Sequence, residues 1–260
     1  MDATVFDLWF KGWRRRRIVK RPLPTRWSLI LEERFWYWHV LTESQRTRLL
    51  QLCAIFLYEK EIVVPASVAD AEAARVTVAA AACLILLGFQ DLYCFDRIRT
   101  VVLTEGSFRQ RVQVGEVDGL LGEVWASGSY AYGAPVAVSW SDVRRECYDQ
   151  DSHRNVVIHE FAHHIDDLDG TLAGDPPFPT RQLVERWQVV SEREFERLEE
   201  LADQGRYTVI DPYGLTDAVE FFAVSCEAYF CNPLELAAAH PELFELLLIL
   251  FQIDPRPWFQ

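Results

Sequence analysis

The spacing of hydrophobic and polar residues alternates between two periods along the chain, and these periods predict helices around a small sheet. Before residue 99, apolar residues recur mainly every three or four positions, which is typical of helices with one buried face. This spacing predicts a helix over about 43–59, opened by a capping-box sequence at 42–45, and a buried, alanine-rich helix over 69–87. Between them, a short apolar run closed by Pro65 predicts a strand.

Between residues 99 and 140 the pattern changes to short β-branched runs separated by Gly, Ser and Asp. Such runs predict strands, and they are RTVVLT (99–104), RQRVQV (109–114) and APVAVSW (134–140). Helical spacing then returns, and the helices predicted from it cover residues 141–148, 154–166, 181–203, 216–230 and 241–252. The expected fold class is therefore α+β, mainly helical, with a small sheet preceding the helix at 154–166.

Charge is distributed unevenly along the chain. The formal net charge is −13, yet residues 1–26 hold eight basic and only two acidic residues, so the remainder holds about −19. An acidic chain of this kind argues against direct nucleic-acid binding. The basic run WRRRRIVKRP (13–22) is consistent with a phosphate-facing arm, a membrane-surface contact, or a solvated segment that pairs with the acidic body. We expect a basic N-terminal arm over 1–40 and one domain over 41–260.

Other features of the composition indicate a cytoplasmic protein. No apolar run reaches the roughly 20 residues that a membrane span requires, and no signal-peptide pattern opens the chain. The six cysteines show no C-x-x-C spacing, so we expect reduced, buried thiols rather than disulfides or a zinc ribbon.

The sequence NVVIHEFAHHIDDLDG (155–170) contains the main candidate for chemistry. On a helix, His159 and His163 lie about 40° apart around the axis and one turn apart along it, so both imidazoles can reach one ion. Glu160 lies about 100° from His159, close enough to contact a water on that ion. This H-E-x-x-H pattern is typical of zinc enzymes, in which the glutamate acts as the general base.

Apolar residues around the motif favour a metal site over a polar surface helix. They indicate a largely buried helix, in which several ionisable groups are costly unless they are paired or bind metal. His164 points about 140° away from His159 and is not expected to be a ligand. Asp166 is a candidate acceptor for the free imidazole N–H of a metal-bound histidine.

A catalytic zinc usually has three protein ligands, and the motif supplies only two. The downstream candidates are Asp211, Asp217, Glu220, Cys226, Glu227 and His240. Glu220 lies in the apolar segment DAVEFFAVSCEAYF, where an inward carboxylate needs a cation, but Glu227 is seven residues later and thus on nearly the same helical face. Two other interpretations remain open, a structural zinc site closed by a fourth ligand such as Glu227 or Cys226, and a chance motif in a metal-free protein.

Several segments resemble the Mlc titration factor A (MtfA) family of zinc-dependent peptidases. They are WRRRRIVKRPLP, AACLILLG, VSWSDV, HRNVVIHEFAHHID and AVEFFAVSCEAYF, of which the last two are the most specific. The resemblance implies a zincin-like metallopeptidase domain with Zn²⁺ held by His159, His163 and Glu220, and Glu160 as the catalytic residue. The catalytic part of the family is similar to anthrax lethal factor, where a tyrosine seven residues before the glutamate ligand faces the zinc. Tyr213 has this spacing here.

The resemblance therefore implies a peptidase that acts on a peptide or protein substrate. A zinc-activated water attacks the peptide carbonyl, with Glu160 as general base and Tyr213 as a donor to the developing oxyanion. The family also binds the Mlc repressor of sugar phosphotransferase genes. The alternative hypothesis is a regulatory protein-binding module that sequesters such a repressor, with peptidase activity secondary.

Overall fold

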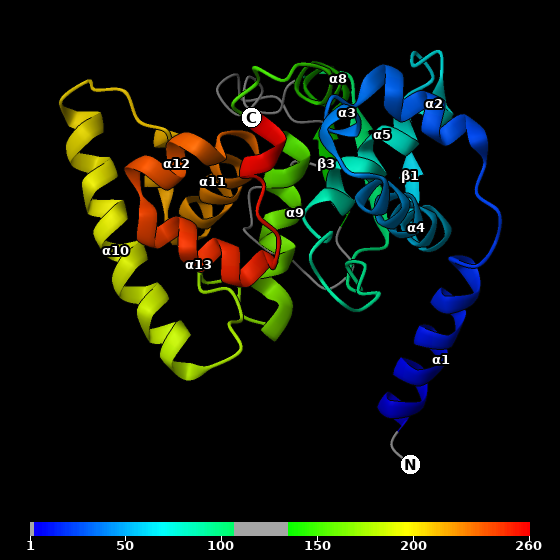
Figure 1. The fold of residues 1–260 in the computed structure, drawn as a ribbon, viewed down its shortest axis with the longest axis horizontal. Helices are drawn as coiled ribbons and strands as arrows, with labels where there is room; N and C mark the ends of the chain where they lie inside the picture. The colour runs from blue at the N-terminus through cyan, green and yellow to red at the C-terminus, as the bar shows by residue number, and fades with distance from the viewer. Residues whose placement is uncertain (1–2, 107–134) are drawn as a thin grey trace, which may run out of the picture. The chain divides into compact units, whose positions relative to one another are not determined.

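A computed structural model describes residues 3–106 and 135–260, with side chains described from residue 10 onward. It divides into two compact units, Met1–Tyr148 and Asp149–Gln260, and each is described by itself (Figure 1). The structure is mainly helical with a three-stranded parallel sheet, which confirms the α+β class expected from the sequence.

The first unit consists of helices that pack around one buried, alanine-rich helix. This helix, α5 (Ala71–Leu84), is buried along almost its whole length, because its small side chains let neighbouring helices approach on several sides. It packs against α4 (Glu43–Glu59), α2 (Thr25–Arg34) and α8 (Trp140–Tyr148). Two further helices, α1 (Ala3–Ile18) and α3 (Tyr37–Val40), belong to the same unit.

The sheet of the first unit has the strand order β1 (Glu61–Val63), β2 (Thr100–Thr104) and β3 (Val136–Ser139), and both pairs are parallel. All four residues of β3 are buried, as expected for a strand covered on both faces. Three predicted strands are therefore confirmed, although the run APVAVSW ends as a strand at Ser139, because Trp140 begins α8. The predicted strand at 109–114 lies outside the described residues.

Basic side chains hold the irregular segment 85–99 against α1 and α4. Arg48 donates to the carbonyl groups of Phe89 and Asp91, and Arg15 donates to that of Leu92. Lys60 Nζ donates to the carbonyl oxygens of Phe95 and Ile98, at 2.7 and 2.8 Å. A loop has few backbone partners of its own, so these cations satisfy carbonyl groups that burial would otherwise leave unpaired.

The second unit is built around α11 (Ala218–Cys231), which is buried on all sides from Phe221 onward. It packs closely against α9 (Val156–Asp166) and the short 3-10 helix η2 (Pro212–Thr216). The remaining elements are η1 (Asp167–Asp169), α10 (Arg181–Asp203), α12 (Pro233–Ala239), α13 (Pro241–Phe251) and η3 (Arg256–Phe259).

Most predicted helices are found with ends shifted by a few residues, and the capping box at Thr42 is confirmed. The helix expected from residue 216 begins at Ala218, because η2 ends at Thr216 and Asp217 caps α11. The sequence pattern did not indicate α1, α2, α3 or α12. The division into an arm over 1–40 and a domain over 41–260 stays a prediction. None of the helices described is long and apolar enough to span a bilayer.

The environment of Lys60 makes a prediction about stability and pH. Burial lowers its pKa from 10.5 to about 8, so between these values the unfolded chain holds a proton that the folded chain has lost. Stability therefore rises with pH over this range. We expect wild type to gain about 1–3 kcal/mol of unfolding free energy between pH 8 and 10.5 relative to Lys60→Met, as measured by urea denaturation. Lys20→Met, at an exposed lysine, serves as the control and should keep the wild-type slope; an unchanged slope in Lys60→Met contradicts the prediction.

Candidate metal centre

Helix α9 begins at a buried asparagine that fixes its first turn. The side-chain oxygen of Asn155 accepts from the backbone N–H groups of Val157 and Ile158, at 3.1 and 3.2 Å. This is an N-cap, which satisfies donors that the start of a helix leaves without partners. The cap stabilises the first turn of α9, and His159 follows one turn later with its backbone N–H donating to the Asn155 carbonyl at 3.0 Å.

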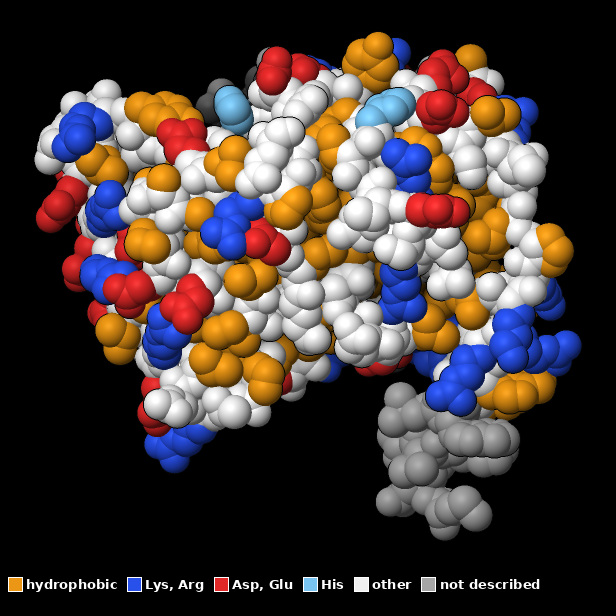
Figure 2. All heavy atoms as spheres, viewed as in Figure 1, with side chains coloured by type: hydrophobic (Ala, Val, Ile, Leu, Met, Phe, Trp, Pro, Cys, Tyr) orange, Lys and Arg blue, Asp and Glu red, His pale blue; other side chains and the backbone are white. Residues whose placement is uncertain are grey.

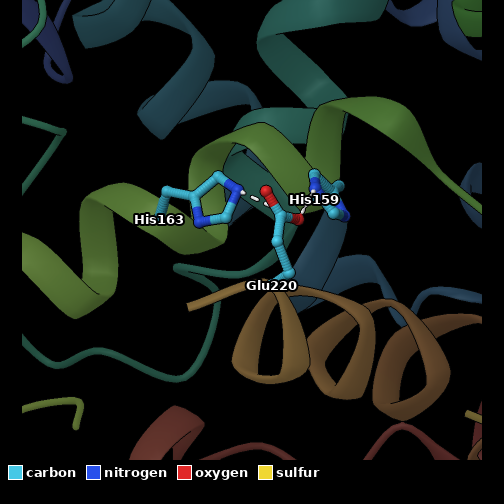
Figure 3. A group of neighbouring side chains, drawn as sticks. All are labelled: His159, His163 and Glu220. Carbon is cyan, nitrogen blue, oxygen red and sulfur yellow. Dashed lines mark ion pairs between the residues drawn. The ribbon is translucent and has the colours of Figure 1, made fainter. Parts of the chain in front are cut away.

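The side chains of His159 and His163 from α9 meet that of Glu220 from α11 (Figure 3). His159 Nε2 lies 3.0 Å from Glu220 Oε2, and His163 Nε2 lies 3.8 Å from the same oxygen. One ligand atom from each residue lies within 4.8 Å of the other two, and among the described residues this is the group of three that meets this criterion. Two imidazoles and a carboxylate form a donor set suited to a transition metal such as zinc.

The position of Glu220 follows from the way α11 starts. Asp217 Oδ1 accepts from the backbone N–H of Glu220 at 2.9 Å, so that residue lies in the first turn of the helix. The preceding element η2 packs tightly on α11, since a Cβ on Gly214 would lie 2.7 Å from Cγ2 of Val224. Close packing and the N-cap together direct the Glu220 carboxylate toward α9.

Glu227, two turns after Glu220 on α11, connects His159 to the start of α9. Its Oε1 lies 2.8 Å from His159 Nδ1, and its Oε2 accepts from the backbone N–H of Asn155 at 2.9 Å. Carboxylates in this position orient metal-binding histidines and fix which ring nitrogen carries the proton. The sequence left Glu220 and Glu227 as competing candidate ligands, and here the two carboxylates face different nitrogens of His159.

Because both ring nitrogens of His159 face a carboxylate, the site requires a positive charge. A neutral imidazole has one N–H and can donate to one of these carboxylates only. The second contact needs either a further proton, on the ring or on a carboxyl group, or a cation between Nε2 and Glu220. Accordingly, burial lowers the pKa of His159, but hydrogen bonds with Glu220 and Glu227 outweigh it and hold the pKa well above its ordinary value. A metal ion satisfies the same requirement while leaving the ring neutral.

The neighbouring groups are also perturbed. Burial raises the pKa of Glu160 to about 7, partly offset by the charge of His159 and reinforced by the carboxylates of Glu220 and Glu227. Burial lowers the pKa of His163, which favours the neutral imidazole that metals bind. A carboxyl group that titrates near neutral pH is suited to both accept and return a proton.

Tyr213 lies in η2, close to the histidines but partly in solvent. Its ring centroid is 6.0 Å from that of His159, and the residue is 41% exposed. Burial and the nearby carboxylates of Glu220 and Glu160 raise the pKa of the phenol to about 12, so it keeps its proton at neutral pH. Asp211 Oδ1 accepts from the Tyr213 backbone N–H at 2.8 Å and fixes the turn.

Asp166, at the end of α9, does not have the role expected for it. Its Oδ2 accepts from the backbone N–H of Gly174 at 2.7 Å, and the structure gives no hydrogen bond between it and either predicted histidine ligand. The Gly174 carbonyl in turn accepts from Trp187 Nε1 on α10 at 2.8 Å. Gly174 has φ +76°, and a Cβ there would lie 2.4 Å from the Ala218 carbonyl oxygen, so this position requires glycine.

The other candidate ligands have different partners. Asp211 pairs with Arg154 at 2.6 Å, and His240 pairs with Glu194 at 2.6 Å. Cys226 is fully buried, which raises the pKa of its thiol. His164 is half-buried, with its ring centroid 6.2 Å from that of Phe161, and is not in the His159 group. The first unit contains a hollow of about 770 Å³ lined by Trp140, Arg144 and Tyr148 among others, and no predicted site residue lines it.

Most of the chain is similar to known proteins. The family model of the glucose-regulated metallo-peptidases (M90) matches residues 10–252. An uncharacterized protein of Synechocystis sp. is 30% identical over 247 residues, which cover 94% of this chain and 89% of the relative. Proteins called Mlc titration factor A from Escherichia fergusonii and Serratia proteamaculans are each 29% identical, over 84% and 83% of this chain and 82% of each relative.

Proposed function

Since the chain belongs to the glucose-regulated metallo-peptidase family M90, we propose that it is a zinc-dependent peptidase whose metal ligands are His159, His163 and Glu220. Family membership shows that the chain is related to metallopeptidases. The identity of the metal as zinc and the roles of these three residues are proposed here. The observation that carries it is the convergence of two imidazoles and one carboxylate around a position that requires a positive charge. Three protein ligands, rather than four, leave a coordination position for water and favour a catalytic over a structural site.

In the proposed mechanism, His159, His163 and Glu220 would hold zinc, which when bound would lower the pKa of a water and polarise the substrate carbonyl. Glu160 takes a proton from the water as it attacks the peptide carbon, then delivers that proton to the leaving amine nitrogen. Burial raises the pKa of this carboxyl, which favours its taking up the proton. The phenol of Tyr213, which keeps its proton, donates to the carbonyl oxygen as that atom becomes negative.

Substitution of Glu160 tests the mechanism. We expect Glu160→Gln to lower kcat for peptide hydrolysis by about 10²–10⁴-fold, because the amide cannot accept and return the proton. Zinc content, measured by atomic emission on the purified protein, should remain that of wild type, since Glu160 is not a ligand. Wild-type turnover in this variant, with the same zinc content, overturns the proposal.

Two further variants separate the roles in the same assay. Glu220→Gln should lose zinc and activity together, because a ligand has been removed. Tyr213→Phe should keep zinc and lower kcat by a smaller factor than Glu160→Gln, because one oxyanion donor is lost. If Tyr213→Phe turns over like wild type, Tyr213 has no catalytic role.

The contacts of Glu227 predict a different effect. Glu227→Gln should weaken zinc binding by about 10–100-fold, because the amide holds the His159 ring less strongly than a carboxylate. Competition with a fluorescent chelator measures this. Glu194→Gln is a matched control, since Glu194 is equally buried and also pairs with a histidine, His240, away from the site. Equal zinc affinities in the two variants contradict the role assigned to Glu227.

The names of two relatives support a second function. They are called Mlc titration factor A, and we propose that this chain likewise binds a Mlc-like repressor in the cytoplasm. Pull-down with purified repressor should capture equal amounts with wild type and Glu160→Gln if binding is independent of the chemistry. If neither protein captures repressor, the partner proposal is wrong while the peptidase proposal stands.

A further inference from the structure

From residue 10 onward, where its side chains are described, helix α1 contacts the first unit through one face. On that face Lys11 pairs with Asp96 at 2.9 Å, and Arg15 pairs with Glu59 at 2.6 Å and also contacts Asp96. Ile18, one turn after Arg15, is buried. These residues follow the helical spacing of four and three positions, so they mark the inner face of α1.

The opposite face of α1 is both aromatic and basic. We define this outer face by Trp13, Arg16 and Arg17 of α1 and by Lys20 in the turn that follows the helix, with Phe10 at its edge. Phe10 is 49% and Trp13 43% exposed, and their ring centroids are 5.8 Å apart. The Arg17 guanidinium lies over the Trp13 ring at 4.7 Å. Figure 2 shows basic and hydrophobic side chains gathered at the C-terminal end of α1.

The exposed cations of this face have no acidic partners within the part of the chain that the structure describes. No ion pair is formed there by Arg16, Arg17, Lys20 or the following Arg21, whereas Lys11, Arg14 and Arg15 all pair with Glu59 or Asp96. Pairing with the acidic body, one of the three interpretations of the basic run, therefore applies to the inner residues only. The outer residues keep their charge available in a chain whose other parts are acidic.

We propose that the outer face of α1 binds the surface of a bilayer that contains anionic lipids. Lys and Arg are attracted to such a surface, each by about five-fold in binding constant. Trp and Phe side chains prefer the boundary between headgroups and acyl chains, where the ring is partly buried. Exposed aromatic side chains beside unpaired cations on one helical face match both requirements. A helix that lies on the surface in this way does not span the membrane.

The distribution of charge favours a bilayer over a nucleic acid. Phosphate binding along a duplex needs cations spread over a groove-sized surface, whereas here they occupy the last turn of one helix and the short segment that follows it. The rest of the chain holds about −19 and would repel a polyanion that wraps around it. A membrane surface needs contact only with this outer face, and screening over about 8 Å at physiological salt reduces its repulsion of acidic residues farther away.

The experiment is co-sedimentation of the full chain with lipid vesicles. Wild type should bind vesicles of phosphatidylcholine with phosphatidylglycerol and not vesicles of phosphatidylcholine alone, and binding should be lost near 1 M salt, where screening extends only about 3 Å. Arg16→Gln with Lys20→Gln should lower the partition coefficient about 25-fold, since two cations are removed. Trp13→Ser should weaken binding with the charge unchanged.

The control removes two cations elsewhere. Arg181→Gln with Arg206→Gln changes net charge equally at exposed positions of the second unit, and it should bind vesicles like wild type. Thermal unfolding confirms that each variant is folded. Equal vesicle binding by the two double variants overturns the proposal, as does equal binding to neutral and anionic vesicles. The proposal is also overturned if the protein does not bind vesicles but binds a duplex oligonucleotide through Arg16 and Lys20.

Discussion

A histidine with a carboxylate on each ring nitrogen is the constraint on which the second unit depends. His159 contacts Glu220 through Nε2 and Glu227 through Nδ1, and both carboxylates come from one helix. This arrangement requires α9 and α11 to pack closely and α9 to have a fixed rotation. The Asn155 cap stabilises the first turn of α9, and Glu227 also accepts from the Asn155 backbone N–H, so the same carboxylate supports the helix start and the imidazole.

Much of this site was predictable because it depends on local spacing. His159 and His163 share a face through the four-residue repeat of a helix, and the apolar residues around them indicated burial. The different contacts of Glu220 and Glu227 with His159 were not predictable from spacing, because a seven-residue separation places both on one face of α11. Which carboxylate reaches which nitrogen depends on how two helices, distant in the sequence, pack together. Asp166 shows the same limit, since its partner Gly174 lies in a loop without a recognisable pattern.

In the fold, the best predictions were also local. Helix α4 carries its start signal in its own sequence, and the structure has it at the expected residues. Helix α1 was missed because its inner face is formed by Lys11 and Arg15, whose burial depends on Glu59 and Asp96 far along the chain. Charged residues give no hydrophobic repeat, although here they serve as interior contacts. The same holds for Lys60, which connects α4 to an irregular loop.

Gly174 joins three helices of the second unit through backbone atoms alone. Its N–H donates to the Asp166 side chain of α9, and its carbonyl accepts from the Trp187 side chain of α10. Its Cα lies against the first turn of α11, the turn that carries Glu220. For protein engineering, this means that positions in the segment between α9 and α10 differ in how well they tolerate substitution. A library that redesigns the segment to alter specificity can vary its exposed positions, but should keep this glycine and its distance from Asp166 constant.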